Sequence, residues 1–214
     1  MKKKRFYISN KEFSNKDPKS FTLKFMHSLN SESDRGCIIV GTSQIEYLTE
    51  SLLRKYFSSD PKVIKEAIDP LFEGFGPLST FASRIKLSYA LNLIDDNVYK
   101  TLNVIRDIRN VCAHELNIVS FADPFIKEKI NNIIIPEDFD SNFEKVINED
   151  LNDDDDNRVL KEIDEEVIKE VIGKLIDNPP IKSDDVEKLV NKNKFMNSLL
   201  YVYFEIGFAI KKKT

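Results

Sequence analysis

The sequence has little glycine, proline, cysteine and histidine, and each shortage excludes a class of protein. Six glycines and eight prolines among 214 residues are too little turn material for a protein of many short strands. The two cysteines, Cys37 and Cys112, form neither a CxxC pair nor a zinc-binding spacing with the two histidines. Phosphate-binding glycine loops and a serine nucleophile elbow are also missing. We therefore expect no metal, no cofactor and two buried, reduced thiols.

Both ends of the chain are basic, but neither carries an export or membrane signal. Residues 1–5 read Met-Lys-Lys-Lys-Arg, and the polar segment after them lacks the apolar stretch of a signal peptide. The apolar helix expected over residues 194–210 is shorter than the roughly 20 residues of a membrane span. It also contains Asn197 and Glu205. These features predict a cytoplasmic protein that does not enter a membrane.

Charges of both signs are abundant. The chain has 32 basic and 36 acidic residues, a net charge of −4, and is 41% hydrophobic. The apolar fraction is sufficient for a core. A net negative charge disfavours a broad DNA-binding face, because phosphate neutralisation dominates such binding. No helix-turn-helix with a basic recognition face is found, so direct nucleic-acid binding is not expected.

Apolar residues recur at three- and four-residue steps along most of the chain, which predicts helices. Ser31 and Asp34 match an S-x-x-D capping box at the start of a long helix. Gly76-Pro77 predicts the start of the helix that follows it. Glu50 and Arg54, four residues apart, are expected to pair. The predicted helices cover residues 21–29, 31–57, 78–95, 97–115, 125–133, 159–176, 184–192 and 194–210. The sequence thus predicts an all-α fold, a compact bundle of about seven to eight helices.

Changes in composition divide the chain into four predicted segments. Residues 1–19 are polar, 20–125 form the helical core, 126–192 are a variable acidic segment with short helices, and 193–214 add an apolar helix that completes the bundle. Ala122-Asp123-Pro124 is expected to end the structure before it. Acidic side chains gather in the third segment, and an acidic surface attracts basic proteins. The candidate partner-binding residues are therefore Asp150, Asp153, Asp154, Asp155, Asp156, Glu162, Glu165 and Glu166.

Arg109, Asn110 and His114 form an unusual polar group inside an apolar-periodic helix. Arg109 is a permanent cation, Asn110 donates and accepts hydrogen bonds, and His114 titrates near neutrality. Such groups can cleave RNA without a metal, when a base activates a 2′-OH and a cation stabilises the phosphorane. The alternative is a polar clasp that joins helix ends, made of Asp34, Arg35, Asp107, Arg109, Asn110 and His114.

The pattern Arg-Asn-x-x-x-His near a helix end resembles the signature of HEPN domains, which are small helical bundles. Many of these are metal-independent ribonucleases with one composite site across a homodimer, and many others are inactive binding modules. The resemblance implies that Arg109 binds the scissile phosphate, Asn110 orients it and His114 acts as the general base.

Four separated blocks resemble, in order, the mannitol operon repressor family. They are Glu32–Cys37, Phe75–Phe81 with Arg84–Ile94, Ile105–His114, and Ser120-Phe121. The resemblance covers residues 25–125 and implies an all-helical regulatory protein. No correspondence is found for residues 126–192.

These observations predict a non-catalytic regulator that binds another protein. The role is either regulation of transcription or, as an immunity protein or antitoxin, neutralisation of a basic nuclease toxin; a homodimer is compatible with both. The alternative is a HEPN-type ribonuclease that uses Arg109, Asn110 and His114. A direct DNA-binding repressor ranks below both.

Overall fold

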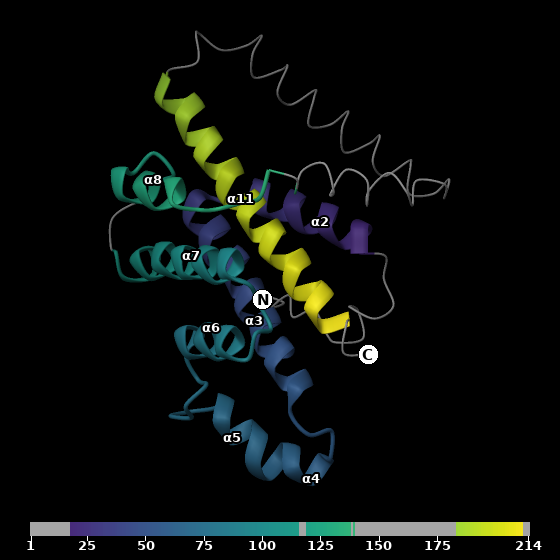
Figure 1. Cartoon of the computed structure of the whole chain (residues 1–214). Coiled ribbons are helices and arrows are strands. Elements are labelled where there is room, and N and C mark those ends of the chain that lie inside the picture. The colour runs from purple at the N-terminus through teal and green to yellow at the C-terminus, as the bar shows by residue number, and fades with distance from the viewer. Residues whose placement is uncertain (1–17, 116–118, 138, 140–182, 212–214) are drawn as a thin grey trace, which may run out of the picture. The chain divides into compact units, whose positions relative to one another are not determined.

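The computed structural model describes residues 18–115, 119–137, 139 and 183–211, and the chain divides into two compact units. One unit comprises Met1–Ser31 and Asp140–Pro179, of which α2 (Pro18–Ser31) is described. The other comprises Glu32–Phe139 and Pro180–Thr214 and contains all the other helices (Figure 1). Every regular element among the described residues is a helix. The predicted all-α fold is confirmed, while the helix expected over residues 159–176 lies outside the described residues.

The long helix α3 (Asp34–Tyr56) does not begin with the predicted capping box. Ser31 is the last residue of α2, and the N-cap of α3 is Ser33, whose hydroxyl accepts a hydrogen bond from Gly36 N at 3.1 Å. Asp34 cannot complete a capping box because its carboxylate is used by residues far along the chain. The prediction of S-x-x-D capping from Ser31 is therefore wrong by two residues.

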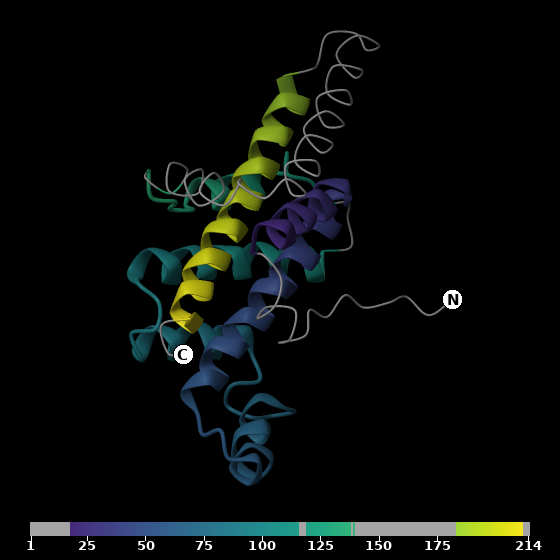
Figure 2. The same ribbon diagram turned by 90° about the vertical axis from the view of Figure 1, so that its right-hand side faces the viewer.

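Helix α3 is covered along its length by other helices of its unit. It packs against α6 (Phe81–Ala90), α7 (Asp96–His114) and α11 (Ser183–Lys211). In both views α11 lies beside α3, although the two are far apart in the sequence (Figure 2). Helices α6, α7 and α8 (Pro124–Asn131) follow one another across the unit, with α7 in the middle (Figure 1).

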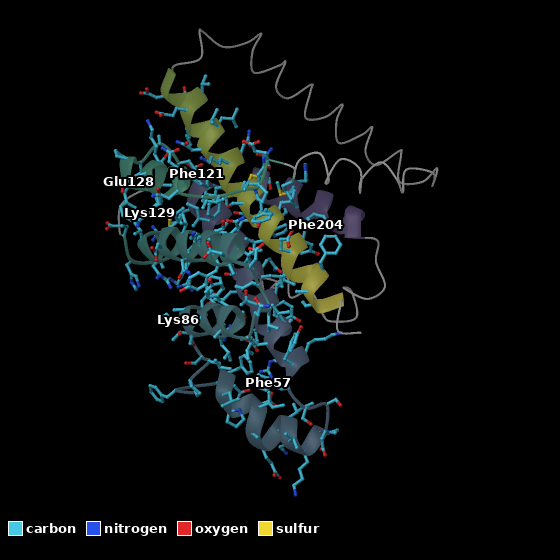
Figure 3. All side chains as sticks on the ribbon, in the orientation of Figure 1. Phe57, Lys86, Phe121, Glu128, Lys129 and Phe204 are labelled. Carbon is cyan, nitrogen blue, oxygen red and sulfur yellow. The ribbon has the colours of Figure 1, made fainter. Side chains whose placement is uncertain are left out.

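A short helical segment after α3 was not predicted. It comprises α4 (Pro61–Val63), the π-helical turn η1 (Ile64–Ile68) and α5 (Asp69–Phe72). Asp60 caps it, and its apolar side chains pack into a small cluster with Phe57, the lowest of the three labelled phenylalanines in Figure 3. Its two prolines and its division into three short pieces leave no long periodic pattern, which explains why the sequence did not reveal it.

The helix α6 starts later and ends earlier than predicted. Thr80, not the residue before Pro77, is the N-cap, and its hydroxyl accepts from Ser83 N. At the other end Asn92 has φ of 55° and Leu93 N donates to Ser88 O at 2.9 Å, the pattern that ends a helix in a left-handed residue. The helix predicted over residues 78–95 was therefore too long at both ends, because the residues on either side of α6 form turns. For α7 the predicted range was correct to within one residue.

In the C-terminal half one predicted helix is confirmed and one predicted boundary is wrong. The helix predicted over residues 125–133 is α8, which Asp123 caps by accepting from Phe125 N and Ile126 N. The two helices expected over 184–192 and 194–210 are one continuous helix, α11. Asn191 is buried and donates to Phe121 O at 2.9 Å, so this polar residue joins α11 to another segment and does not interrupt it. Phe121 lies close to α11, with its ring 5.6 Å from that of Phe195 (Figure 3).

The main core lies where α3, α7 and α11 meet. Its side chains are fully buried aliphatic and aromatic groups from all three helices: Ile38, Ile45, Leu52, Leu102, Ile105, Ile108, Phe195, Leu199, Val202 and Ile206. Each such side chain contributes about 1.5–3 kcal/mol when it leaves water. The core therefore fixes α7, which carries the Arg109–His114 motif, against the rest of its unit.

Leu102→Ala should lower the free energy of unfolding by about 2–5 kcal/mol, because Leu102 is fully buried and the truncation leaves a cavity. Leu91→Ala is the matched control, because Leu91 is 48% exposed at the end of α6. Urea unfolding followed by circular dichroism measures both. Equal losses in the two variants would contradict this placement of the core.

Candidate functional site

Asp34, one of the predicted clasp residues, joins three segments of its unit. Its Oδ2 accepts hydrogen bonds from the Ser120 hydroxyl at 3.0 Å and from Phe121 N at 3.1 Å. The same oxygen lies 3.1 Å from Nζ of Lys188 on α11, and the Asp34 side chain is only 11% exposed. A nearly buried carboxylate needs such partners, because its charge is otherwise poorly solvated. Asp34 therefore ties the start of α3 to the segment before α8 and to α11.

Arg35, the next residue, reaches the end of α7. Its Nη2 donates to the carbonyl oxygen of Glu115, the C-cap residue of α7, at 2.8 Å. A cation at this position satisfies a terminal carbonyl and is favoured by the negative end of the helix dipole. Asp34 and Arg35 thus form a clasp at helix ends; the predicted clasp also included Asp107, Arg109, Asn110 and His114, which take no part in these contacts.

The two cysteines lie beside this clasp and are buried and unpaired. Burial raises the pKa of Cys112 to about 11, against the smaller, opposing effect of Arg35. Burial likewise raises the pKa of Cys37 to about 12. Because the thiolate is the reactive form, both groups are inert at neutral pH, and the expectation of buried thiols is confirmed.

Asp107 belongs to a different group of charges, on the exposed side of α7. It pairs with Arg106 at 2.8 Å and lies 3.8 Å from Nζ of Lys129 on α8. Arg106 also donates to Oδ1 of Asn103 at 2.8 Å. Of the two arginines near it in the sequence, Asp107 therefore pairs with Arg106.

The three motif residues belong neither to the Asp34–Arg35 clasp nor to the group of charges around Asp107. They are Arg109, Asn110 and His114. The contact that joins them is a long hydrogen bond, 3.4 Å, from Nη1 of Arg109 to Oδ1 of Asn110. Asn110 and His114 are exposed and Arg109 is half-buried. Within the described residues, His114 has no hydrogen-bond or ion-pair partner. Asp34 and Arg35 hold the helix ends together, so this structural task does not fall to the three motif residues.

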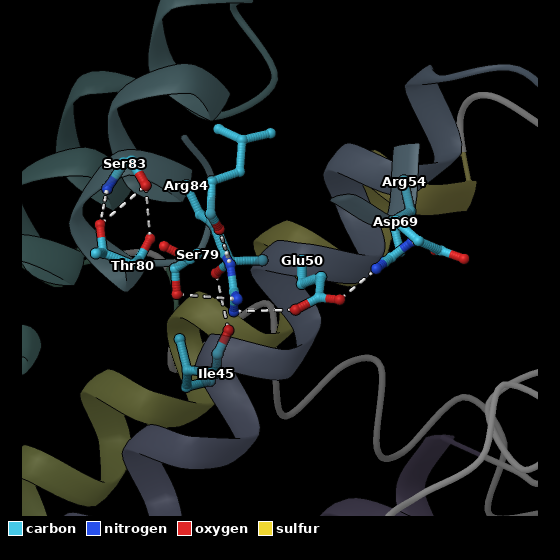
Figure 4. A network of polar contacts seen from close by, with 10 residues as sticks. Ile45, Glu50, Arg54, Asp69, Ser79, Thr80, Ser83 and Arg84 are labelled. Carbon is cyan, nitrogen blue, oxygen red and sulfur yellow. Dashed lines mark hydrogen bonds and ion pairs between the residues drawn. The ribbon is translucent and has the colours of Figure 1, made fainter. Parts of the chain in front are cut away.

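A second polar network, which the sequence revealed only in part, centres on Glu50 of α3. The predicted pair is present, with 2.8 Å between Oε1 of Glu50 and Nε of Arg54. The other oxygen of Glu50 lies 3.0 Å from Nη1 of Arg84 on α6, and Arg54 also pairs with Asp69 on α5 at 2.7 Å (Figure 4). One carboxylate therefore connects α3, α5 and α6.

The two arginines of this network also surround Phe72. The guanidinium carbon of Arg54 lies 4.3 Å from the centre of the Phe72 ring, and that of Arg84 lies 5.8 Å from it. These are cation–π distances, which strengthen when the groups are partly removed from water. Arg84 also donates to the carbonyls of Leu78 at 2.8 Å and Ser79 at 3.4 Å. The network thus fixes the turn between α5 and α6.

Phe75, at this turn, is the most exposed apolar side chain among the described residues. Its relative exposure is 108%, whereas the other exposed large apolar side chains range from 37% to 57%. A solvated phenylalanine contributes nothing to the core. Phe75 lies in one of the family-like blocks of the sequence, but its exposure depends on the fold and could not be predicted from the sequence.

Other predictions concern metals, membranes and acidic residues. No cluster of metal-binding side chains occurs in the described part of the chain, and none of its helices combines the length and apolar character needed to span a bilayer. The eight acidic candidates between Asp150 and Glu166 lie outside the described residues.

An all-helical unit with partly buried ion pairs and a largely exposed polar motif at one helix end is a helical-bundle protein. The sequence model of the mannitol repressor family matches residues 26–176. That is more than half of the chain, and the chain therefore belongs to the mannitol repressor family. The match continues beyond residue 125, so the family-like region is longer than the four sequence blocks indicated.

Individual relatives match a shorter stretch. The mannitol operon repressors of Escherichia coli strain K12 and of E. coli O6:H1 strain CFT073 are each 33% identical over 82 residues, which is 37% of this chain. The matched stretch spans only 42% of the length of these relatives.

Two solved structures share the fold. The X-ray structure of the MtlR–HPr complex from E. coli matches with a TM-score of 0.57 at 17% identity, over 88% of this chain and 99% of that chain. The possible transcriptional regulator YggD from Shigella flexneri 2a strain 2457T matches with a TM-score of 0.51 at 13% identity, over 90% and 96%. At these identities the likeness establishes the fold alone.

Asp34→Asn should lower the free energy of unfolding by about 1–3 kcal/mol, because the amide is neutral and has fewer acceptor sites for Ser120, Phe121 and Lys188. Glu187→Gln is the control: its partner is Lys127, both side chains are 45% exposed, and solvent screening limits the loss to about 0.5 kcal/mol. Urea unfolding compares the two. A loss from Asp34→Asn no larger than that from Glu187→Gln would refute the clasp.

Proposed function

We propose that this protein is a regulator that acts by binding another protein. The observation that carries this proposal is membership of the mannitol repressor family over residues 26–176. The shared fold with an MtlR that was solved in complex with HPr supports a protein as the partner. HPr, or a protein of similar surface, is the first candidate for that partner.

The distribution of charge supports a protein partner over DNA. Several basic side chains among the described residues of this unit are used in ion pairs with carboxylates: Arg54, Arg84, Lys100, Arg106, Lys127, Lys129 and Lys188. A protein that grips DNA needs its cations free to neutralise phosphates. A direct DNA-binding repressor therefore remains the weaker proposal.

The contact surface that we propose is the exposed end of α7, with Arg109, Asn110 and His114. These side chains combine a cation, an amide and a titratable ring, and their engagement within the described residues is limited to the 3.4 Å contact between Arg109 and Asn110. Arginine is enriched at protein interfaces because it offers five donors and a planar surface. Their position on a helix that is rigidly packed in the core keeps the entropic cost of binding low.

Titration of the full chain with HPr encoded by the same genome, followed by calorimetry, tests this proposal. Wild type should form a saturable complex, and the double variant Arg109→Ala/His114→Ala should bind at least about tenfold more weakly. Lys100→Ala, on the same helix, is the control and should bind like wild type. The absence of a complex with wild-type protein would reject HPr as the partner.

A second candidate, a metal-independent ribonuclease, is supported by the exposure of Asn110 and His114 one helical turn apart. In this proposal His114 acts as the base and Arg109 stabilises the phosphorane, in a site completed by a second copy. Purified protein should then cleave RNA in the presence of EDTA, and His114→Ala should abolish cleavage while the circular dichroism spectrum is unchanged. Equal activity in wild type and His114→Ala would reject it.

The narrower role of neutralising a basic nuclease toxin rests on acidic side chains outside the described residues. Residues 140–182 contain 14 acidic and six basic side chains, and such an excess accelerates association with a basic protein. It is a special case of the protein-binding proposal that differs in the partner.

A further inference from the structure

The turn between α5 and α6 presents the ring of Phe75 to solvent from a fixed backbone. Gly76 N donates to Glu73 O at 2.8 Å, Leu78 N to Leu71 O at 2.8 Å, and Ser79 N to Gly76 O at 3.0 Å. Leu78, three residues after Phe75, is buried in the small apolar cluster with Phe72. The backbone on both sides of Phe75 is therefore hydrogen-bonded, and its next apolar neighbour is anchored.

Two glycines allow the chain to take this path. Gly74 has φ of 56°, a conformation that costs other residues roughly 1–2 kcal/mol. At Gly76 a Cβ atom would lie 2.2 Å from the carbonyl oxygen of Pro70 and 2.4 Å from that of Leu71, so no larger residue fits. The backbone packs closely on itself while the side chain between the two glycines points into open solvent.

Side chains from other helices hold the turn in this shape. Arg84 donates to the carbonyls of Leu78 and Ser79 and pairs with Glu50, which itself pairs with Arg54 (Figure 4). Arg84 is only 12% exposed. A nearly buried arginine with three acceptors moves little, so the turn is a pre-organised element of the fold.

We propose that Phe75 is the aromatic anchor of the partner contact and inserts into an apolar pocket on the partner protein. The inference rests on the proposed protein-binding function and names the residue that contributes most to it. Aromatic side chains that leave water completely dominate interface energetics, and a pre-ordered turn removes the entropic cost of fixing them. Because the backbone of the turn is already ordered, the exposed ring can contact a partner with little further loss of conformational entropy.

The chemistry around the turn selects a protein as the partner. Glu73, two residues before Phe75, is exposed, and residues 73–83 contain no basic side chain. The turn itself therefore offers no cation to a phosphate, which disfavours nucleic acid and anionic lipid surfaces. It fits a pocket with apolar walls and a basic side chain at its rim.

The location of the turn agrees with a single contact surface. The turn between α5 and α6 and the C-terminal end of α7 lie on the same side of the unit in Figure 1. Lys86 of α6 also points away from the core on this side (Figure 3). A partner that binds Phe75 would therefore approach the side of the unit that carries the end of α7.

Photo-crosslinking followed by affinity measurement tests the anchor. Full-length chain with p-benzoylphenylalanine in place of Phe75 is irradiated in the host cells, and should crosslink to one discrete protein. The affinity of that purified protein for the Phe75→Ala variant should be at least about 30-fold weaker than for wild type. The unfolding midpoint should not change, because the ring is fully exposed.

Phe125→Ala is the matched control, since Phe125 is a 39% exposed phenylalanine on α8, on the other side of α7. It should alter affinity less than about threefold. No crosslink from position 75, or a Phe75→Ala variant with wild-type affinity, overturns the anchor. A second probe at Asn110 separates the two proposals: if position 110 captures a partner and position 75 does not, protein binding stands and the anchor falls; if neither captures one, both fall.

Discussion

The carboxylate of Glu50 is the contact on which the arrangement of α3, α5 and α6 depends. Its two oxygens accept from Arg54 and Arg84, and these arginines in turn hold Asp69, the ring of Phe72 and two carbonyls of the following turn. A carboxylate shared by two partly buried cations is strongly coupled, since removal of any member leaves another charge without a partner. The shape of the turn at Phe75 is therefore determined from a helix that is distant in the sequence.

Asp34 has the corresponding role at the other end of α3. Together with Arg35 it binds the end of α7, the segment before α8, and α11. Helix α3 therefore carries a polar junction near each end and an apolar face between them. Because these junctions supply the structural polar contacts, Arg109, Asn110 and His114 remain exposed or nearly unengaged, which is the property expected of a binding surface.

Local signals predicted the helices well where periodicity and capping agree, as in α7, which follows the cap Asp95. They failed where a residue type is common both in turns and at the start of helices. Pro77 lies in a turn and not in a first helical turn, and Ser31 ends one helix instead of capping the next. The candidate site shows the same limit: the spacing of Glu50 and Arg54 was readable, but Arg84 and Asp69 join them only in the fold. Likewise, nothing local distinguishes the exposed Phe75 from the buried Phe72.

The contact between α3 and α11 also has a consequence for biosynthesis. The ribosome completes α3 at residue 56 and begins α11 at residue 183, an interval on the order of ten seconds at typical elongation rates. During that time the apolar faces of α3 and α7 have no α11 to cover them. The nascent chain therefore passes through a stage in which this part of the core is incomplete, until α11 packs against α3 and α7.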